Sequence, residues 1–166
     1  ISGVCHGQGR SAPCADATVG EKVQELADLG VQVQCGSDQV EGTFDLTIAS
    51  PGIPDTSELF LSAKAASKQI MGEPEFAYQE SPSQWIGITG TNGKTTTTSL
   101  TTSILQYAGL DASAVGNIGF TITVQLAERK SESWFVAELS SFQLATTQKL
   151  HPHVAMLLNI TPDHLE

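Results

Sequence analysis

The glycine-rich segment at residues 90–96 has the residue types and the spacing of a phosphate-binding loop. Its two glycines allow the backbone to curl so that consecutive N–H groups point at anionic oxygens, and a helix that begins after the loop directs its positive end to the same charge. In such loops the lysine reaches the β- and γ-phosphates, and the hydroxyl that follows it binds Mg²⁺. The residues predicted to line a nucleotide are Gly90, Thr91, Asn92, Gly93, Lys94, Thr95 and Thr96.

One position departs from the strict phosphate-loop pattern, G-x-x-x-x-G-K-[ST]. The pattern requires a glycine five residues before Gly93, where this chain has Ile88. We therefore interpret the loop as a variant in which Gly90 supplies the turn, with the strand before it and the helix after it that the pattern requires.

Polar residues also follow two other apolar segments that read as buried strands. Glu138 lies near the end of the segment 133–139, and Asn159, Asp163 and His164 follow the segment 154–158. The carboxyl ends of parallel strands meet at the ligand-binding edge of a sheet, and a carboxylate on an apolar strand is costly to bury without a partner. We expect Glu138 to bind Mg²⁺ and His164 to serve the metal or a γ-phosphate. A structural hydrogen bond for Glu138 and a turn histidine at 164 remain the alternatives.

A second candidate ligand loop follows the apolar run at residues 44–49. It contains Ser50, Pro51 and Gly52, and a glycine turn at the carboxyl end of a strand is a common ligand site in open α/β sheets. A rigid turn without a ligand explains the same spacing.

The elements that would position these residues alternate between strands and helices. Strands are predicted at 85–88, 112–115, 133–139 and 154–158, and a helix is predicted after the phosphate loop despite its many threonines, whose β-branched side chains disfavour helix. The helix is supported by one apolar face, formed by Leu100, Ile104, Leu105 and Ala108, and by Gly109 at its end. The segment 120–126 fits a helix or a strand.

The first half of the chain reads as a separate α/β region. Strands are predicted at 1–5, 31–35, 44–49 and 68–71, with helices from about residue 18 to Gly30, from Asp55 or Thr56 to residue 67, and at 73–79. The fold class is therefore α/β: an incomplete Rossmann-like domain at 1–79, a polar linker at 80–84, and from 85 to 166 the first part of a phosphate-loop ATPase domain with a mostly parallel sheet. A G-x-G-x-x-A match at Gly7, Gly9 and Ala12 offers a weaker, dinucleotide-binding interpretation.

Charge and composition exclude several classes of partner. The chain carries 18 acidic and 8 basic residues, a formal net charge of −10, so no clustered Lys/Arg surface is present to neutralise nucleic-acid phosphates or anionic lipids. The three cysteines have no metal-ligand spacing and indicate free thiols in a reducing compartment. No run is long and apolar enough for a membrane span. We expect a cytoplasmic monomer.

Four motifs together resemble the Mur ligases: TGTNGKTT (89–96), GNIG (116–119), ELSSFQL (138–144) and LNITPDHLE (158–166). The ELSSFQL motif is most similar to the members that add D-glutamate to UDP-N-acetylmuramoyl-L-alanine, and SPGI (50–53) matches their UDP-sugar domain. The resemblance covers nearly the whole chain from residue 4 onward. It implies ATP and Mg²⁺ as cofactors, with UDP-N-acetylmuramoyl-L-alanine and D-glutamate as substrates.

The resemblance also implies individual roles. Lys94 would hold the β- and γ-phosphates and Thr95 a Mg²⁺, while Glu138 and His164 would bind a second Mg²⁺. The residues implied to contact the substrate are Asn117 and Gln143 on the muramoyl-alanine part, with Ser140 and Ser141 nearby, and Ser50, Pro51 and Gly52 on the UDP part. The implied reaction is amide formation through an acyl phosphate.

Two features depart from the family, and three rival functions remain. His6 stands where the family commonly has an acidic residue near the uridine, and the chain resembles a fragment that lacks both ends, so we expect these 166 residues alone not to complete the reaction. The rivals are a sibling or folylpolyglutamate-type ligase, a non-catalytic nucleotide-binding module, and the dehydrogenase suggested by Gly7 and Gly9.

Overall fold

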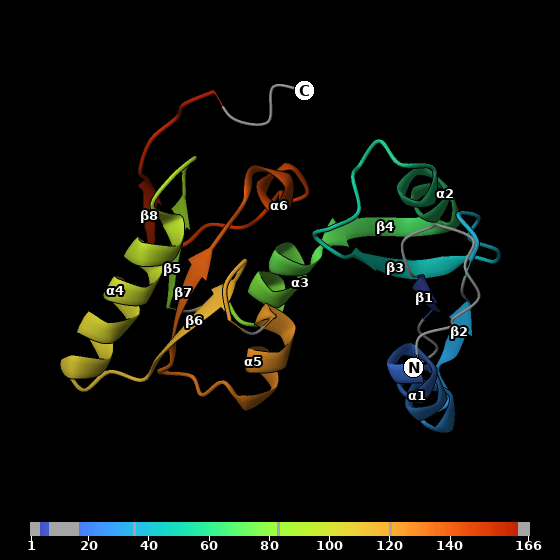
Figure 1. Ribbon diagram of the computed structural model, residues 1–166, viewed down its shortest axis with the longest axis horizontal. Helices are drawn as coiled ribbons and strands as arrows, with labels where there is room; N and C mark the ends of the chain where they lie inside the picture. Colours follow the sequence, from blue (N-terminus) through green and yellow to red (C-terminus); the bar gives the residue numbers. More distant parts are fainter. Residues whose placement is uncertain (1–3, 7–16, 35, 83, 120, 163–166) are drawn as a thin grey trace. The chain divides into compact units, whose positions relative to one another are not determined.

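The chain forms two units in the computed structural model, which describes residues 4–6, 17–34, 36–82, 84–119 and 121–162 (Figure 1). The first unit comprises Ile1–Thr47 and Gly52–Ile70, and the second comprises Ile48–Pro51 and Met71–Glu166. The division therefore falls earlier in the chain than the predicted linker at 80–84. Residues 1–3 of the predicted strand at 1–5 lie outside the described residues, and so do the glycines at 7 and 9.

The first unit contains two small sheets and two helices. One sheet pairs β1 with β2 in parallel, and the other pairs β3 with β4, whose last residues fall in the second unit. The bounds of these elements are β1 Val4–His6, α1 Ala17–Asp28, β2 Gln32–Gln34, β3 Phe44–Ala49, α2 Glu58–Ala66 and β4 Ser67–Gly72.

The N-cap of helix α2 lies one residue after Thr56 and two residues after Asp55, the two predicted caps. Its N-cap is Ser57, whose Oγ accepts a hydrogen bond from the Phe60 N–H at 3.2 Å and donates one to the Pro54 carbonyl at 2.7 Å. Ser57 satisfies one of the unpaired N–H groups of the first turn, so Asp55 and Thr56 are not needed as caps. The helix buries Leu59, Phe60 and Ala63.

The second unit contains a four-stranded parallel sheet in the order β6-β7-β5-β8, which confirms the predicted mostly parallel sheet. The chain passes from β5 to β6, returns to β7 between them, and then crosses to β8 on the other side of β5. Its element bounds are α3 Glu73–Glu80, β5 Trp85–Thr89, α4 Lys94–Tyr107, β6 Ala112–Gly116, α5 Ile122–Glu128, β7 Trp134–Glu138, α6 Ser141–Ala145 and β8 Val154–Leu157. The part of the undecided segment 120–126 from Ile122 onward thus lies in helix α5.

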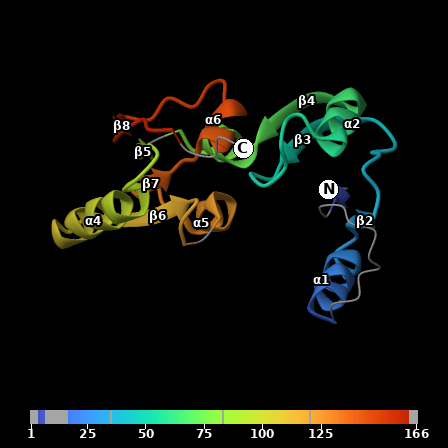
Figure 2. The same ribbon diagram turned by 45° about the horizontal axis from the view of Figure 1, so that its top comes forward.

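The two faces of this sheet bury different side chains, as the alternation along each strand requires. Figures 1 and 2 show α4 on one side of the sheet and α3, α5 and α6 on the other. On the α3 side, Trp85 and Phe135 are buried with residues of α3 and α5, and their rings meet edge to face at 5.2 Å. On the α4 side, Ile86, Ile88 and Val136 form a second cluster.

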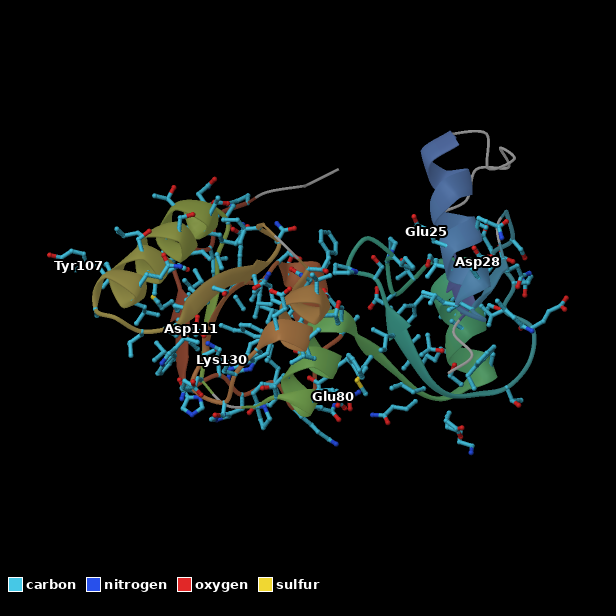
Figure 3. The ribbon with its side chains drawn as sticks, turned by 90° about the horizontal axis from the view of Figure 1, so that it is seen from below. Glu25, Asp28, Glu80, Tyr107, Asp111 and Lys130 are labelled. Atoms are coloured by element: carbon cyan, nitrogen blue, oxygen red, sulfur yellow. The ribbon has the colours of Figure 1, made fainter. Side chains whose placement is uncertain are left out.

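Helix α4 confirms the predicted helix, but only Leu105 of the predicted apolar face packs against the sheet. Thr98 and Thr102 are buried and Leu105 packs against the sheet, whereas Leu100 and Ile104 are 59% and 58% exposed. Figure 3 shows Tyr107 extending away from the end of the same helix. Among the described helices, none is both long and apolar enough to cross a membrane.

Candidate functional site

The carboxyl ends of all four parallel strands lie at one edge of the sheet. The register pairs Ile88 of β5 with Glu138 of β7, and Glu138 in turn with Gly116 of β6. On the other side of β5, Thr89 pairs with Leu157 of β8. The glycine-rich loop, the end of β7 and the segment after β8 therefore gather at this edge, which is where open α/β sheets bind ligands.

The glycine-rich loop leads directly from β5 into α4. Gly93 is the N-cap of α4, and the helix begins at Lys94. The Lys94 ammonium folds back over the loop and donates to the carbonyls of Gly90 at 2.7 Å and Thr91 at 2.9 Å. Thr95 and Thr96, in the first turn of α4, are exposed. This arrangement places a cation and the positive end of a 14-residue helix at the strand edge, which suits an anionic ligand.

The segment after β8 holds the loop from its other side. Asn159 hydrogen bonds to the backbone of Thr91 and Asn92, and Thr161 hydrogen bonds to the Thr91 hydroxyl. Sequence reasoning placed Asn159 at this edge but gave neither Asn159 nor Thr161 a role. The available signal was a polar residue immediately after an apolar segment that was predicted to be a buried strand. In the structure this strand, β8, is mostly exposed.

Glu138 presents a buried carboxylate that is only half satisfied. The residue is 2% exposed, and its Oε1 accepts a hydrogen bond from the Asn117 side chain at 3.3 Å. Its Oε2 is buried and has no hydrogen-bond partner among the described residues. A bare carboxylate oxygen in the interior is costly, and a bound cation is the usual compensation in a phosphate site. The Asn117 backbone also donates to the Glu138 carbonyl at 2.9 Å, which fixes the GNIG turn against the end of β7.

Ser140 and Gln143 form a capping box at the start of α6. The Ser140 hydroxyl accepts from the Gln143 N–H at 3.2 Å, and the Gln143 side-chain oxygen accepts from the Ser140 N–H at 2.9 Å. Gln143 is 2% exposed, whereas Ser141 is exposed. The sequence interpretation gave Ser140 and Gln143 substrate contacts only, so this local role in ending β7 and starting α6 is one that it missed.

The other residues predicted for the site are His164 and the turn formed by Ser50, Pro51 and Gly52. His164 lies outside the described residues. Ser50, Pro51 and Gly52 form an exposed turn after β3, at the division between the two units. Over the described ranges, no group of three or more His, Cys, Asp or Glu side chains is placed to hold a metal. Glu138 is thus the one acidic residue of the predicted magnesium site that the structure describes.

The fold and the loop define the class of protein. A parallel sheet whose central strand runs through a glycine-rich loop into a helix, with a lysine and two threonines at the start of that helix, is a phosphate-loop α/β domain.

Comparisons with known proteins identify the family more closely. The model of the Mur ligase middle domain matches residues 88–166. The chain is 42% identical over 148 residues to the UDP-N-acetylmuramoylalanine--D-glutamate ligase of Geobacillus kaustophilus, with 87% of this chain and 33% of that protein covered. It is 45% identical over 147 residues to the ligase of the same name from Lacticaseibacillus casei, with 86% and 32% covered.

A solved structure shows the same fold. The UDP-N-acetylmuramate:L-alanyl-gamma-D-glutamyl-meso-diaminopimelate ligase from Neisseria meningitides superposes with a TM-score of 0.50 at 20% sequence identity, covering 98% of this chain and 54% of that one. Residues 88–166 match the Mur ligase middle domain, and the chain is similar to Mur ligases over most of its length. It spans about a third of the length of the curated relatives that it matches.

Proposed function

We propose that this chain is part of an ATP-dependent ligase that joins D-glutamate to UDP-N-acetylmuramoyl-L-alanine, in the synthesis of the peptidoglycan precursor. The observation that carries the proposal is the half-satisfied carboxylate of Glu138, held at the same strand edge as Lys94 and the phosphate loop. The relatives at 41–45% identity that bear the name of this ligase support the choice of substrates.

The described residues suit phosphoryl transfer, which depends on positioning and charge neutralisation more than on a protein nucleophile. The carboxylate of the L-alanine unit would attack the γ-phosphate of ATP, giving an acyl phosphate and ADP. The amine of D-glutamate would then displace phosphate and form the amide. Lys94 would hold the β- and γ-phosphates, and the amides at the start of α4 would orient them.

Magnesium fits the donors that are present. The Thr95 hydroxyl would hold one Mg²⁺, and the Glu138 carboxylate would hold a second, with His164 as its further ligand by family resemblance. The ions would neutralise charge on the transferred phosphoryl group. Asn117 would orient Glu138, and Asn117, Ser141 and the Gln143 amide nitrogen would face the muramoyl-alanine part. Ser50, Pro51 and Gly52 would contact the UDP part.

The proposed ligase acts in the cytoplasm as a monomer. With only a third of the relatives' length, the 166-residue chain alone is expected to bind Mg·ATP without turnover. Activity is therefore tested in a chimera, in which this chain replaces the matching third of the Geobacillus kaustophilus ligase.

The test is phosphate release by this chimera with Mg·ATP and UDP-N-acetylmuramoyl-L-alanine, across amino acids that include both enantiomers of glutamate. We expect release with D-glutamate only. Lys94→Ala should abolish it, and Lys130→Ala, which changes an exposed lysine after α5, should not. Release with another amino acid would assign the chain to a sibling ligase. A folded chimera that binds ATP but releases nothing would favour the nucleotide-binding module.

A further inference from the structure

The phosphate loop does not hold its conformation alone, because the segment after β8 pairs with its first half, at Thr91 and Asn92. The Asn159 side chain makes a two-way pair with the backbone of Asn92: its Oδ1 accepts from the Asn92 N–H at 2.9 Å, and its Nδ2 donates to the Asn92 carbonyl at 2.9 Å. The Asn159 carbonyl accepts from the Thr91 N–H at 3.1 Å. A single asparagine therefore fixes three consecutive peptide units of the loop, those that join residues 90 to 93.

A second pair joins the Thr91 side chain to Thr161, two residues after Asn159. The Thr91 hydroxyl donates to the Thr161 carbonyl at 3.1 Å and accepts from the Thr161 N–H at 3.0 Å. Gly90 lies close to the same segment: a Cβ at that position would approach the Asn159 backbone nitrogen to 3.1 Å and its carbonyl oxygen to 3.2 Å. The φ of Gly90 is +143°, a value that side-chain-bearing residues rarely adopt.

These bonds decide which amides can bind phosphate. The N–H groups of Thr91 and Asn92 are directed at Asn159, so they are not available to an anion in this conformation. The N–H groups of the first turn of α4, at residues 94–96, have no intrahelical acceptor by the geometry of a helix N-terminus. Asn159 therefore turns the first half of the loop toward β8 and leaves the second half to face the ligand.

The same bonds also determine the position of the lysine. Lys94 donates to the carbonyls of Gly90 and Thr91, and these belong to the peptide units that Asn159 and Thr161 hold. A loop released from Asn159 would carry these carbonyls, and with them the ammonium group, to a new position. Asn159 thus acts on Lys94 through the loop backbone and not by direct contact.

We infer that Asn159 is a positioning residue for the nucleotide, with Thr91 and Thr161 as its partners: it fixes the phosphate loop so that Lys94 and the first turn of α4 meet the terminal phosphates. The inference rests on the proposed function, because it assumes that the loop binds Mg·ATP. It does not require the ligase reaction, so it can be tested on the 166-residue chain.

The test is the affinity of the chain for Mg·ATP, measured by isothermal titration calorimetry, alongside urea unfolding of each variant without nucleotide. Asn159→Ala should weaken binding by on the order of 10- to 100-fold, the cost of a small misplacement of positioning groups. Thr91→Val should also weaken it, whereas Thr91→Ser, which keeps the hydroxyl, should restore affinity. Ser103→Ala, which removes a hydroxyl bond within α4 away from the loop, is the matched control and should bind normally.

A double-mutant comparison separates positioning from a general loss of structure. If Asn159 acts through Lys94, then Asn159→Ala should cost much less affinity in a Lys94→Ala background than in the wild type. The inference is overturned if Asn159→Ala costs the same affinity in both backgrounds. It is also overturned if Asn159→Ala and Thr91→Val both bind Mg·ATP within twofold of the wild type. Either result leaves the proposed function standing. If the wild-type chain itself fails to bind Mg·ATP, the nucleotide part of the proposed function fails and the inference fails with it. If Asn159→Ala does not fold, the Mg·ATP affinities of Thr91→Val and Thr91→Ser still test the inference.

Discussion

At the scale of single residues, Glu138 shows a conflict between stability and the proposed chemistry. Its buried, unpartnered Oε2 costs the fold free energy when no cation is bound. We predict that Glu138→Gln unfolds at a higher urea concentration than the wild type without Mg²⁺, with a gain of ~1–2 kcal/mol, because the variant buries no charge.

The higher stability of Glu138→Gln should disappear when Mg·ATP is present. Mg·ATP should raise the unfolding midpoint of the wild type more than that of Glu138→Gln, because binding to the native state stabilises it by mass action. Glu128→Gln, which changes an exposed carboxylate at the end of α5, should follow the wild type in both conditions. A Glu138→Gln variant that is less stable than the wild type without ligand would show that the carboxylate has a structural role.

Two threonines on α4 form a natural matched pair. Thr98 is fully buried and its Oγ1 has no hydrogen-bond partner in the described part of the chain, whereas the buried Thr102 hydroxyl donates to the Thr98 carbonyl at 2.8 Å. Thr98→Val should therefore stabilise the chain by about 1 kcal/mol, since valine has nearly the same shape and no unsatisfied hydroxyl. Thr102→Val should give no such gain in thermal unfolding. A loss of stability in Thr98→Val would contradict this account.

At the scale of elements, α3 fixes the connection that leads into β8. Glu75 is 1% exposed and its carboxylate accepts from three consecutive N–H groups, those of Gln148, Lys149 and Leu150. Burial opposes ionisation of this carboxyl, but these bonds and one from the Gln79 side chain outweigh it, so the pKa of Glu75 is lowered. A group with a lowered folded-state pKa contributes stability above its ordinary pKa, and this contribution is lost as the pH falls through the folded value.

The prediction is a pH-dependent difference between the wild type and Glu75→Gln. At pH 7 the variant should be less stable by about 2 kcal/mol, because a neutral amide replaces a carboxylate that accepts several hydrogen bonds. The difference should persist down to the ordinary pKa of 4.5 and shrink below it. Urea unfolding at a series of pH values measures this, with Glu80→Gln at the exposed end of the same helix as the control. A difference that does not change with pH would exclude ionisation as its source.

Helix α4 also shows how far sequence reasoning extends. Glycine spacing and a lysine predicted the loop and the helix, because these are local requirements of a phosphate site. The predicted buried face was wrong in part: Leu105 packs against the sheet, but Leu100 and Ile104 are exposed while Thr98 is buried. The face that this helix buries is the one that packs against the sheet, where Leu105 contacts the cluster of Ile86, Ile88 and Val136. Such long-range contacts leave no periodic signal in the sequence of the helix itself.

At the scale of the whole molecule, the two units differ in the core that each one builds. The second unit buries Trp85, Phe135 and the residues around them on both faces of a four-stranded sheet. The described part of the first unit has two-stranded sheets, which are marginal alone, and its buried apolar side chains are Leu59, Phe60 and Ala63 of α2. We therefore expect the first unit to unfold at a lower denaturant concentration than the second.

Both tryptophans of the chain make this difference measurable, because Trp85 and Trp134 lie in the second unit. Trp85 is fully buried between the rings of Tyr78 and Phe135, so its fluorescence reports on that core. Far-ultraviolet circular dichroism also reports on α1 and α2 of the first unit. In a urea titration the dichroism signal should fall in two steps. The first step, from the first unit, should precede any change in fluorescence, and the second step should coincide with the fluorescence change. Two superimposable transitions would show instead that the units unfold cooperatively.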